Sequence, residues 1–210
     1  GTRSLDEQRS ANANILAYLN LSNLAIARDN LRQSVLDVLG LRASLVVSAQ
    51  GGLLAEGPLQ GFNPMTGSKV KMLGHSLGGI VATSAVAAAN NTLGSPNADA
   101  LYTFSSASVQ NSGGQIGNLL LGSEAYGAQI RHNLAYAASA DYASYADASC
   151  TQLEDKTCYE AFEAAATETQ LATLEAGFSQ FIYAAQTTLD TVDPFTNASD
   201  LVASGSLTTP

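Results

Sequence analysis

Positive charge is scarce in this chain of 210 residues: nine Lys and Arg stand against 18 Asp and Glu, for a formal net charge of −9. No stripe of basic residues runs along it, which argues against a nucleic-acid partner. Long apolar runs are missing too, since no stretch reaches the roughly 18 uninterrupted apolar residues of a transmembrane helix. The sequence shows no signal peptide and does not begin with Met, so we expect a mature product or a piece of a longer protein.

Cysteine and histidine are rare, with two of each. Cys150 and Cys158 lie close enough in sequence to staple a short loop in an oxidising compartment, the alternative being two free thiols. Low charge and abundant Ala, Ser, Thr, Asn and Gln favour the disulfide and a secreted location, either extracellular or periplasmic. With 46% hydrophobic residues, the chain has enough apolar surface for one sizeable core and a small subdomain.

The most informative stretch runs from residue 68 to residue 90. Val70, Met72 and Leu73 predict a short buried strand, Gly74-His-Ser-Leu-Gly78 matches Gly-x-Ser-x-Gly, and Ile80–Ala89 predicts a helix of small apolar residues. Strand, tight turn and helix are the context in which this motif forms a nucleophile elbow. Ser76 would then be strained and exposed, and Gly74 and Gly78 would let the strand and helix approach each other. The alternative is a glycine-rich turn in an inert α/β domain.

Helices and one further strand are expected around the elbow. Residues 1–20 and 21–41 predict helices, with Gly40 as a plausible stop for the second. Residues 50–67 are rich in Gly and Pro and predict a loop. Ala100–Ser105 predicts the next buried strand, and strand, helix, strand at this spacing favours a parallel βαβ unit.

The second half of the chain has a different character. Residues 108–117 predict a Gly/Ser/Asn loop, residues 116–190 contain only helical patterns, and residues 159–189 predict one long amphipathic helix. We interpret these helices as a cap or lid, the alternative being an ordinary helical flank of the core. The expected organisation is therefore an α/β-hydrolase core segment over 1–110, a helical cap or lid over 111–190 and an exit loop over 191–210.

A serine hydroxyl needs a general base and an orienting acid, and this chain offers few candidates. His75 belongs to the elbow and is interpreted as a structural or pocket-wall residue. His132 follows the serine but lies in a predicted helical segment, earlier than the order Ser, acid, His requires. Asp190 and Asp193 could serve as the acid or be ordinary turn residues. The simplest interpretation is an internal segment of a larger enzyme, with a partial hydrolase fold and a triad completed outside this chain.

Five blocks of the sequence resemble the Pla-1/cef family of extracellular lipases from marine and aquatic gammaproteobacteria. They cover residues 19–21, 27–34, 39–42, 70–80 and 185–194. The resemblance implies an α/β-hydrolase domain of a longer secreted or surface-anchored lipoprotein that hydrolyses lipid esters, with Ser76 at the nucleophile position. It also implies that Gly1–Ser4 follows a His-Gly near the oxyanion region and that the acid and histidine lie after Pro210. Residues 126–158 depart from the family pattern.

The expected mechanism is ester hydrolysis through an acyl-enzyme on Ser76, with the Leu77 N–H as one oxyanion donor and no metal or cofactor. The expected partners are a lipid ester substrate, a membrane surface and the remaining N- and C-terminal parts of the same protein. The expected location is extracellular or on the outer-membrane surface. A thioesterase or acyltransferase would use the same elbow, a peptidase is less favoured, and a non-catalytic lipid- or partner-binding fragment is an alternative of another class. By itself the chain is expected to be inactive.

Overall fold

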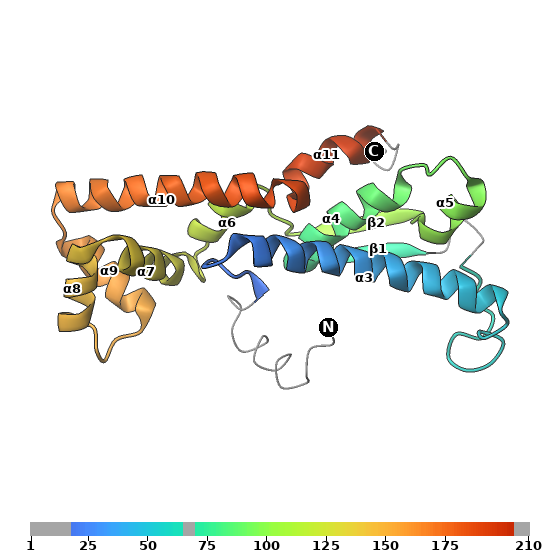
Figure 1. Ribbon diagram of the computed structural model, residues 1–210. Helices are drawn as coiled ribbons and strands as arrows, with labels where there is room; N and C mark the ends of the chain where they lie inside the picture. Colours follow the sequence, from blue (N-terminus) through green and yellow to red (C-terminus); the bar gives the residue numbers. More distant parts are fainter. Residues whose placement is uncertain (1–17, 65–69, 204–210) are drawn as a thin grey trace. The chain divides into compact units, whose positions relative to one another are not determined.

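The computed structural model describes residues 18–64 and 70–203 of the chain (Figure 1). The expectations for residues 1–17, including Gly1–Ser4, lie outside the described residues. The described chain divides into two compact units. The first holds the residues up to Gly114 together with those from Leu189 onward, and the second is Gln115–Thr188.

The first unit combines one long helix, a small parallel sheet and shorter helices. Its elements are α3 (Leu24–Gln50), β1 (Lys71–His75), α4 (Leu77–Asn90), α5 (Pro96–Tyr102), β2 (Ser106–Gln110), the short 3-10 helix η1 (Asp190–Val192) and α11 (Pro194–Ala203). An α/β architecture with parallel strands flanked by helices is therefore confirmed, at the level of two strands.

Helix α3 is longer than expected. The Asn23 side chain caps it by accepting the Ile26 N–H, and the helix then continues to Gln50, through Gly40. The predicted stop at Gly40 is wrong, because one glycine inside a helix costs only about 1 kcal/mol relative to alanine and the apolar pattern resumes at Leu45–Val47. Val46, in this apolar run, is completely buried and packs the last turns of α3 against the rest of the unit.

The sheet consists of β1 paired in parallel with β2, in a register that sets Lys71 beside Ser106 and His75 beside Gln110. The strand expected over residues 70–73 is present, but its predicted burial is wrong: Gly74 is the one buried residue of β1, and Leu73 is 70% exposed because the described sheet has only two strands. The parallel βαβ arrangement is confirmed, but the position of its second strand is not Ala100–Ser105. Pro96 begins a helix there instead, and Asp99 in its first turn accepts the Leu93 N–H. The second strand begins at Ser106, and all its residues are exposed, so no apolar run marks it in the sequence.

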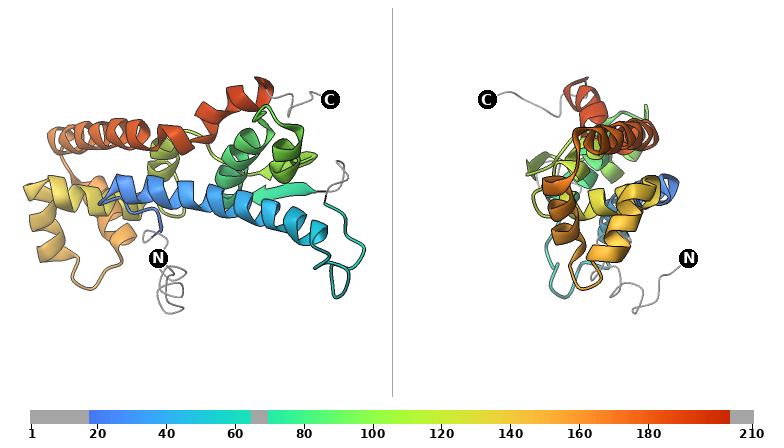
Figure 2. Two further views of the ribbon diagram at one scale, coloured as in Figure 1. Left: turned by 45° about the vertical axis from the view of Figure 1, so that its right-hand side comes forward. Right: turned by 90° about the vertical axis from the view of Figure 1, so that its left-hand side faces the viewer.

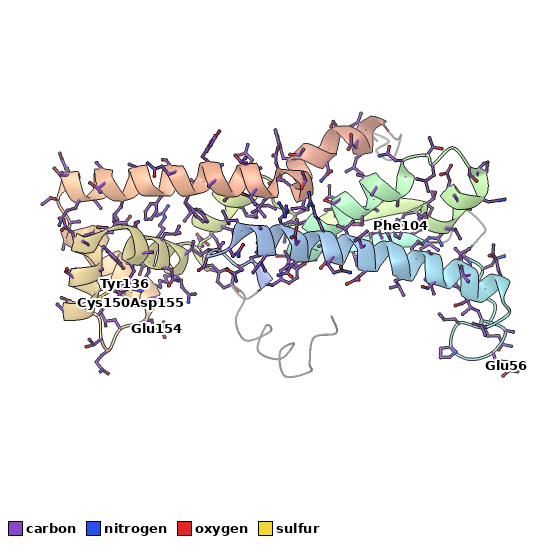
Figure 3. All side chains as sticks on the ribbon, in the orientation of Figure 1. Glu56, Phe104, Tyr136, Cys150, Glu154 and Asp155 are labelled. Atoms are coloured by element: carbon purple, nitrogen blue, oxygen red, sulfur yellow. A yellow bond between two sulfur atoms is a disulfide. The ribbon has the colours of Figure 1, made fainter. Side chains whose placement is uncertain are left out.

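Helix α4 is the centre of the first unit, with ten of its residues buried. α3 and α11 flank it (Figure 2), and Phe104 packs beside Val86 and Ala89 in the core (Figure 3). The prediction of an exit loop over 191–210 is wrong in its first part, because Pro194–Ala203 forms α11, which packs against α4. Asn197 donates to the Ser84 hydroxyl at 3.0 Å, and this contact fixes the returning chain.

A buried arginine joins α3 to the segments that enter the two strands. Arg42 is only 5% exposed, and its guanidinium donates to the carbonyls of Pro64, Ala100 and Thr103 at 3.1–3.4 Å. These carbonyls lie before β1 and before β2. One side chain of α3 therefore binds chain segments that precede both strands.

The second unit is entirely helical within the described residues. It contains α6 (Ile116–Leu121), α7 (Gly127–Ala138), α8 (Ala140–Ser149), α9 (Asp155–Ala165) and most of α10 (Glu168–Leu189). In Figure 2, α7, α8 and α9 (yellow to orange) gather beside α10 (red-orange). None of the described helices of either unit is long and apolar enough to cross a membrane.

The single long helix expected over 159–189 is in fact two helices. Thr167 accepts the Gln170 N–H on its hydroxyl, and Gln170 Oε1 accepts the Thr167 N–H in return at 3.0 Å. This reciprocal pair is a capping box, which satisfies the free N–H groups at a helix start. The Thr-x-x-Gln pattern was therefore the sequence signal for the break.

Candidate active site

The turn between β1 and α4 has the geometry of a nucleophile elbow. Ser76 stands between His75, which ends β1, and Leu77, which begins α4, and its backbone has φ 53° and ψ −124°. This combination lies outside the regions that L-residues ordinarily occupy and costs about 1–3 kcal/mol. Ser76 is exposed. The turn therefore presents a hydroxyl to solvent at the carboxyl end of a parallel strand.

Backbone hydrogen bonds hold Ser76 in this conformation. Its N–H donates to the Gln110 carbonyl at 3.0 Å, and its own carbonyl accepts the N–H groups of Gly79 at 2.8 Å and Ile80 at 3.2 Å. The first bond ties the serine to the end of β2, and the other two begin α4. Because strand pairing and helix initiation both act on this residue, the surrounding fold maintains the strain.

Of the two glycines expected to allow close approach around Ser76, only Gly74 has that role. A Cβ atom at Gly74 would lie 2.5 Å from the Gly78 carbonyl oxygen and 2.6 Å from Ala82 Cβ, so β1 and α4 meet there. A Cβ atom at Gly78 would meet nothing within 4 Å, whereas one at Gly79 would lie 2.8 Å from Ser112 Cβ. Gly74 is required for close approach, as expected. The second close approach is at Gly79, not Gly78, because Gly79 is the glycine that faces the loop after β2.

The first turn of α4 offers one candidate oxyanion donor. Leu77 is the first helical residue, and no hydrogen-bond acceptor for its N–H is found within the described part of the chain. N–H groups at a helix start point along the axis and carry the positive end of the helix dipole. Beside the serine hydroxyl, this N–H can stabilise a developing negative charge.

A short segment after β2 belongs to the site although the sequence did not single it out. Asn111 has φ 50°, and its side-chain nitrogen lies 3.3 Å from His75 Nε2. Ser112, which touches Gly79, has a buried hydroxyl oxygen with no hydrogen-bond partner among the described residues. The signal available in the sequence was position alone, because residues after a parallel strand next to the elbow lie at the same sheet edge.

The rings of the two histidines contact residues other than Ser76. His75 is exposed on β1 and contacts Asn111. His132 belongs to the second unit, where its Nδ1 lies 2.8 Å from the Tyr142 hydroxyl and its Nε2 lies 3.5 Å from an Asp155 carboxylate oxygen. Both ring nitrogens of His132 therefore have partners within its own unit.

The two candidate acids serve the start of α11. Asp193 is completely buried, and its Oδ1 accepts the Phe195 N–H at 2.8 Å; this is the interaction of a helix N-cap. Asp190 Oδ1 accepts the Thr196 hydroxyl at 2.9 Å. Asp193 is therefore engaged as a helix cap and Asp190 in a side-chain contact with α11, in line with the turn alternative that the sequence left open.

The second unit is built around aromatic rings and a disulfide. Cys150 and Cys158 form the expected disulfide, which joins the end of α8 to α9 (Figure 3). Tyr142 lies edge-on to Phe162 with ring centroids 4.9 Å apart and contacts Tyr159 at 6.1 Å. Burial, with a smaller contribution from the Glu163 carboxylate, raises the pKa of Tyr159 to about 12. Burial also raises the pKa of Tyr142 well above its ordinary value.

No group of three or more His, Cys, Asp or Glu side chains suited to a metal ion occurs in the described ranges 18–64 and 70–203.

Comparison with known proteins finds no matching family model, no matching curated protein and no matching solved structure. The geometry of the elbow is therefore the main indication of function.

Proposed function

We propose that this chain carries the nucleophile of a serine ester hydrolase of the lipase or phospholipase type. The observation that supports this most is the strained backbone of Ser76, exposed between a parallel strand and the helix it initiates. Gln115 also has a positive φ, but its ψ of 61° lies in the left-handed region, whereas the ψ of −124° at Ser76 lies outside it and is the more strained combination. The resemblance of residues 70–80 to the Pla-1/cef lipases points to the same chemistry.

In the proposed reaction, Ser76 Oγ attacks the ester carbonyl carbon while a histidine takes its proton. The tetrahedral oxyanion accepts hydrogen bonds from the Leu77 N–H and from one further amide. The C–O bond to the leaving alcohol then breaks as the histidine protonates that oxygen, and water hydrolyses the acyl-enzyme. The chemistry proposed here uses no metal and no cofactor.

The general base of this proposal lies outside the 210 residues. Support comes from His75, which contacts Asn111, and from His132, whose two ring nitrogens contact Tyr142 and Asp155. Asp190 and Asp193 are likewise engaged at α11. The chain would then act with other parts of the same protein and be inactive alone.

The proposed substrate is a lipid ester, met at a membrane surface, and the proposed location is extracellular or on the outer-membrane surface. The Cys150–Cys158 disulfide supports an oxidising compartment, where such bonds persist. The helical second unit is the proposed cap or lid.

The engaged histidines and acids also favour a second candidate, a non-catalytic lipid- or partner-binding fragment. A thioesterase or acyltransferase would share the elbow and is separated from an esterase by substrate profiling. The binding candidate predicts that Ser76→Ala leaves lipid or partner binding intact.

The test is hydrolysis of p-nitrophenyl esters by the 210-residue chain and by a longer chain extended at both ends, each beside its Ser76→Ala variant. We expect no turnover from the folded short chain and Ser76-dependent turnover from the extended chain. Turnover by the short chain that disappears in Ser76→Ala would place the base inside it and make His132 the leading candidate. No turnover from a folded extended chain would argue for the binding candidate.

A further inference from the structure

One aromatic ring of the first unit is exposed near the elbow. Phe195, at the start of α11, is 68% exposed, whereas Phe104 in the core of the same unit is 6% exposed. Single exposed apolar side chains are common on protein surfaces, so exposure by itself carries no functional meaning. The position of this ring relative to Ser76 gives it one.

The loop after β2 connects the serine to this ring through three successive contacts. At its start, the Gln110 carbonyl accepts the Ser76 N–H at 3.0 Å. Ser112 then lies against Gly79 in the first turn of α4. Two residues later, a Cβ atom at Gly114 would lie 3.1 Å from Phe195 Cβ. The stretch 110–114 therefore leads from the backbone of Ser76 to the Cβ atom of Phe195.

Helix α4 gives an independent measure of this separation. Asn197, two residues after Phe195, donates to the Ser84 hydroxyl at 3.0 Å. Ser84 follows Ser76 by eight residues, which corresponds to about 12 Å along a helix axis. The contact of Gly114 with Phe195 places the Cβ atom of Phe195 beside the loop that also contacts Gly79. Phe195 thus starts from a point about 12 Å or less from Ser76 along α4, a distance that a long acyl chain with its carbonyl at Ser76 can span.

The backbone under the ring is held rigidly. The buried Asp193 carboxylate accepts the Phe195 N–H at 2.8 Å, and Pro194 fixes the preceding φ angle. A side chain whose backbone is fixed in advance loses little further entropy when a ligand covers it. A buried carboxylate therefore fixes the backbone of a residue whose side chain remains exposed to solvent.

From these observations we infer that Phe195 is a specificity-determining residue that binds the distal part of the acyl chain of an ester attacked by Ser76. The inference rests on the proposed function and deepens it. The carbonyl lies at the elbow, the first methylenes follow the loop 110–114, and the end of a long chain covers the ring. A short acyl chain does not reach Phe195, so the ring selects for long-chain esters.

The first test measures chain binding without requiring a general base. Because the described cysteines are both in the disulfide, Ser76→Cys introduces a single free thiol at the elbow. The folded variant is treated with methyl, butyl and decyl methanethiosulfonate, below the micelle concentration of each. In each reaction the thiolate bonds to the alkyl sulfur and methanesulfinate leaves. The ratio of the decyl rate to the methyl rate reports how well the protein holds a chain beside residue 76.

We expect Phe195→Ala to lower this ratio about fivefold, the factor that corresponds to losing about 40 Å² of covered apolar surface. Phe195→Leu should restore most of it. Val202→Ala is the matched control, since Val202 is 63% exposed on the same helix, and it should leave the ratio unchanged. A ratio that is the same in Ser76→Cys with and without Phe195→Ala would overturn the inference.

The second test separates this inference from the proposed function. In the extended, folded protein with native Ser76, kcat/KM is compared for p-nitrophenyl acetate and p-nitrophenyl decanoate. We expect Phe195→Ala to lower only the decanoate value, by about fivefold. The role of Phe195 would be contradicted if kcat/KM for acetate and decanoate changed equally, or if neither changed. Ser76 would remain the nucleophile in either case. An alkyl-chain effect on the thiol without any ester turnover would contradict the proposed function and leave the chain-binding surface in place.

Discussion

The two units of this chain are stabilised by different kinds of contact. In the first unit, the backbones of β1 and α4 pack directly against each other at Gly74, and α4 buries mostly small residues. In the second unit, side chains supply the order, through a cluster of aromatic rings and a disulfide. Close backbone approach leaves the residues between the two elements little freedom to move, which suits the proposed role of Ser76. Ring packing and a staple secure a group of short helices that otherwise have little to hold them.

The largest effect on stability is expected at Gly74, where β1 and α4 are in close contact. Gly74→Ala places a methyl group 2.5 Å from the Gly78 carbonyl oxygen, and overpacking of this kind against backbone should destabilise the chain by about 3 kcal/mol. Gly78→Ala is the matched control and should be neutral or slightly stabilising, since its Cβ meets nothing and alanine favours a helix. Urea unfolding followed by circular dichroism measures both. Equal losses in the two variants would show that close approach at Gly74 does not organise the unit.

The second unit should be sensitive to loss of its staple. Replacing both Cys150 and Cys158 by serine opens a loop with a sequence separation of 8, for which chain entropy predicts a loss of about 2.5 kcal/mol. Amide hydrogen exchange should then speed up in α8 and α9 and stay unchanged in α4. Faster exchange in α4 as well would mean that the two units unfold together, which would contradict their being stabilised by separate sets of contacts.

Alkaline pH should also act on the second unit. Six of the eight tyrosines lie there, and the folded-state pKa of Tyr159 is about 12, above its ordinary value of about 10. A raised pKa means that the unfolded chain loses the proton first. The stabilisation by neutral Tyr159 is therefore complete below about pH 10 and is lost as the pH rises toward 12. Thermal unfolding of Tyr159→Phe should show a shallower decline over this window, and an unchanged slope would contradict the assignment.

The smallest expected effect is a gain in the first unit. Ser76→Gly relieves a positive φ that costs about 1–3 kcal/mol, against an entropic loss of up to about 1 kcal/mol in the unfolded chain. We expect a net gain of about 1 kcal/mol, or an increase in Tm of about 2–4 °C for a chain of this length. Ser76→Ala, which keeps the Cβ atom, should give no such gain. A lower Tm for Ser76→Gly would show that the turn is unstrained.

The sequence carried enough information to predict the elbow but not its surroundings. The strand, the turn and the helix over 70–90 follow from a glycine pattern and an apolar run that have few other solutions. β2 could not be predicted because Ser106–Gln110 is exposed throughout, while the apolar residues just before it belong to α5. The role of Gly79, in place of Gly78, depends on Ser112, which only the folded loop brings into contact.

The second unit shows which sequence signals were missed and which were absent. The capping box at Thr167 and Gln170 was present and would have split the predicted long helix. The contacts of His132 with Tyr142 and Asp155 were not predictable, since they join residues of three different helices. The same holds for Arg42, whose carbonyl partners lie 22 to 61 residues away along the chain.

The central claim is that Ser76 is a nucleophile, and covalent labelling tests it most directly. The extended protein is treated with a fluorophosphonate, digested, and mapped by mass spectrometry, beside Ser76→Ala. The account predicts one phosphonyl group per chain, on the peptide that contains Ser76, and none in the variant. A folded protein that remains unlabelled, or that is labelled on another serine in both forms, would contradict it.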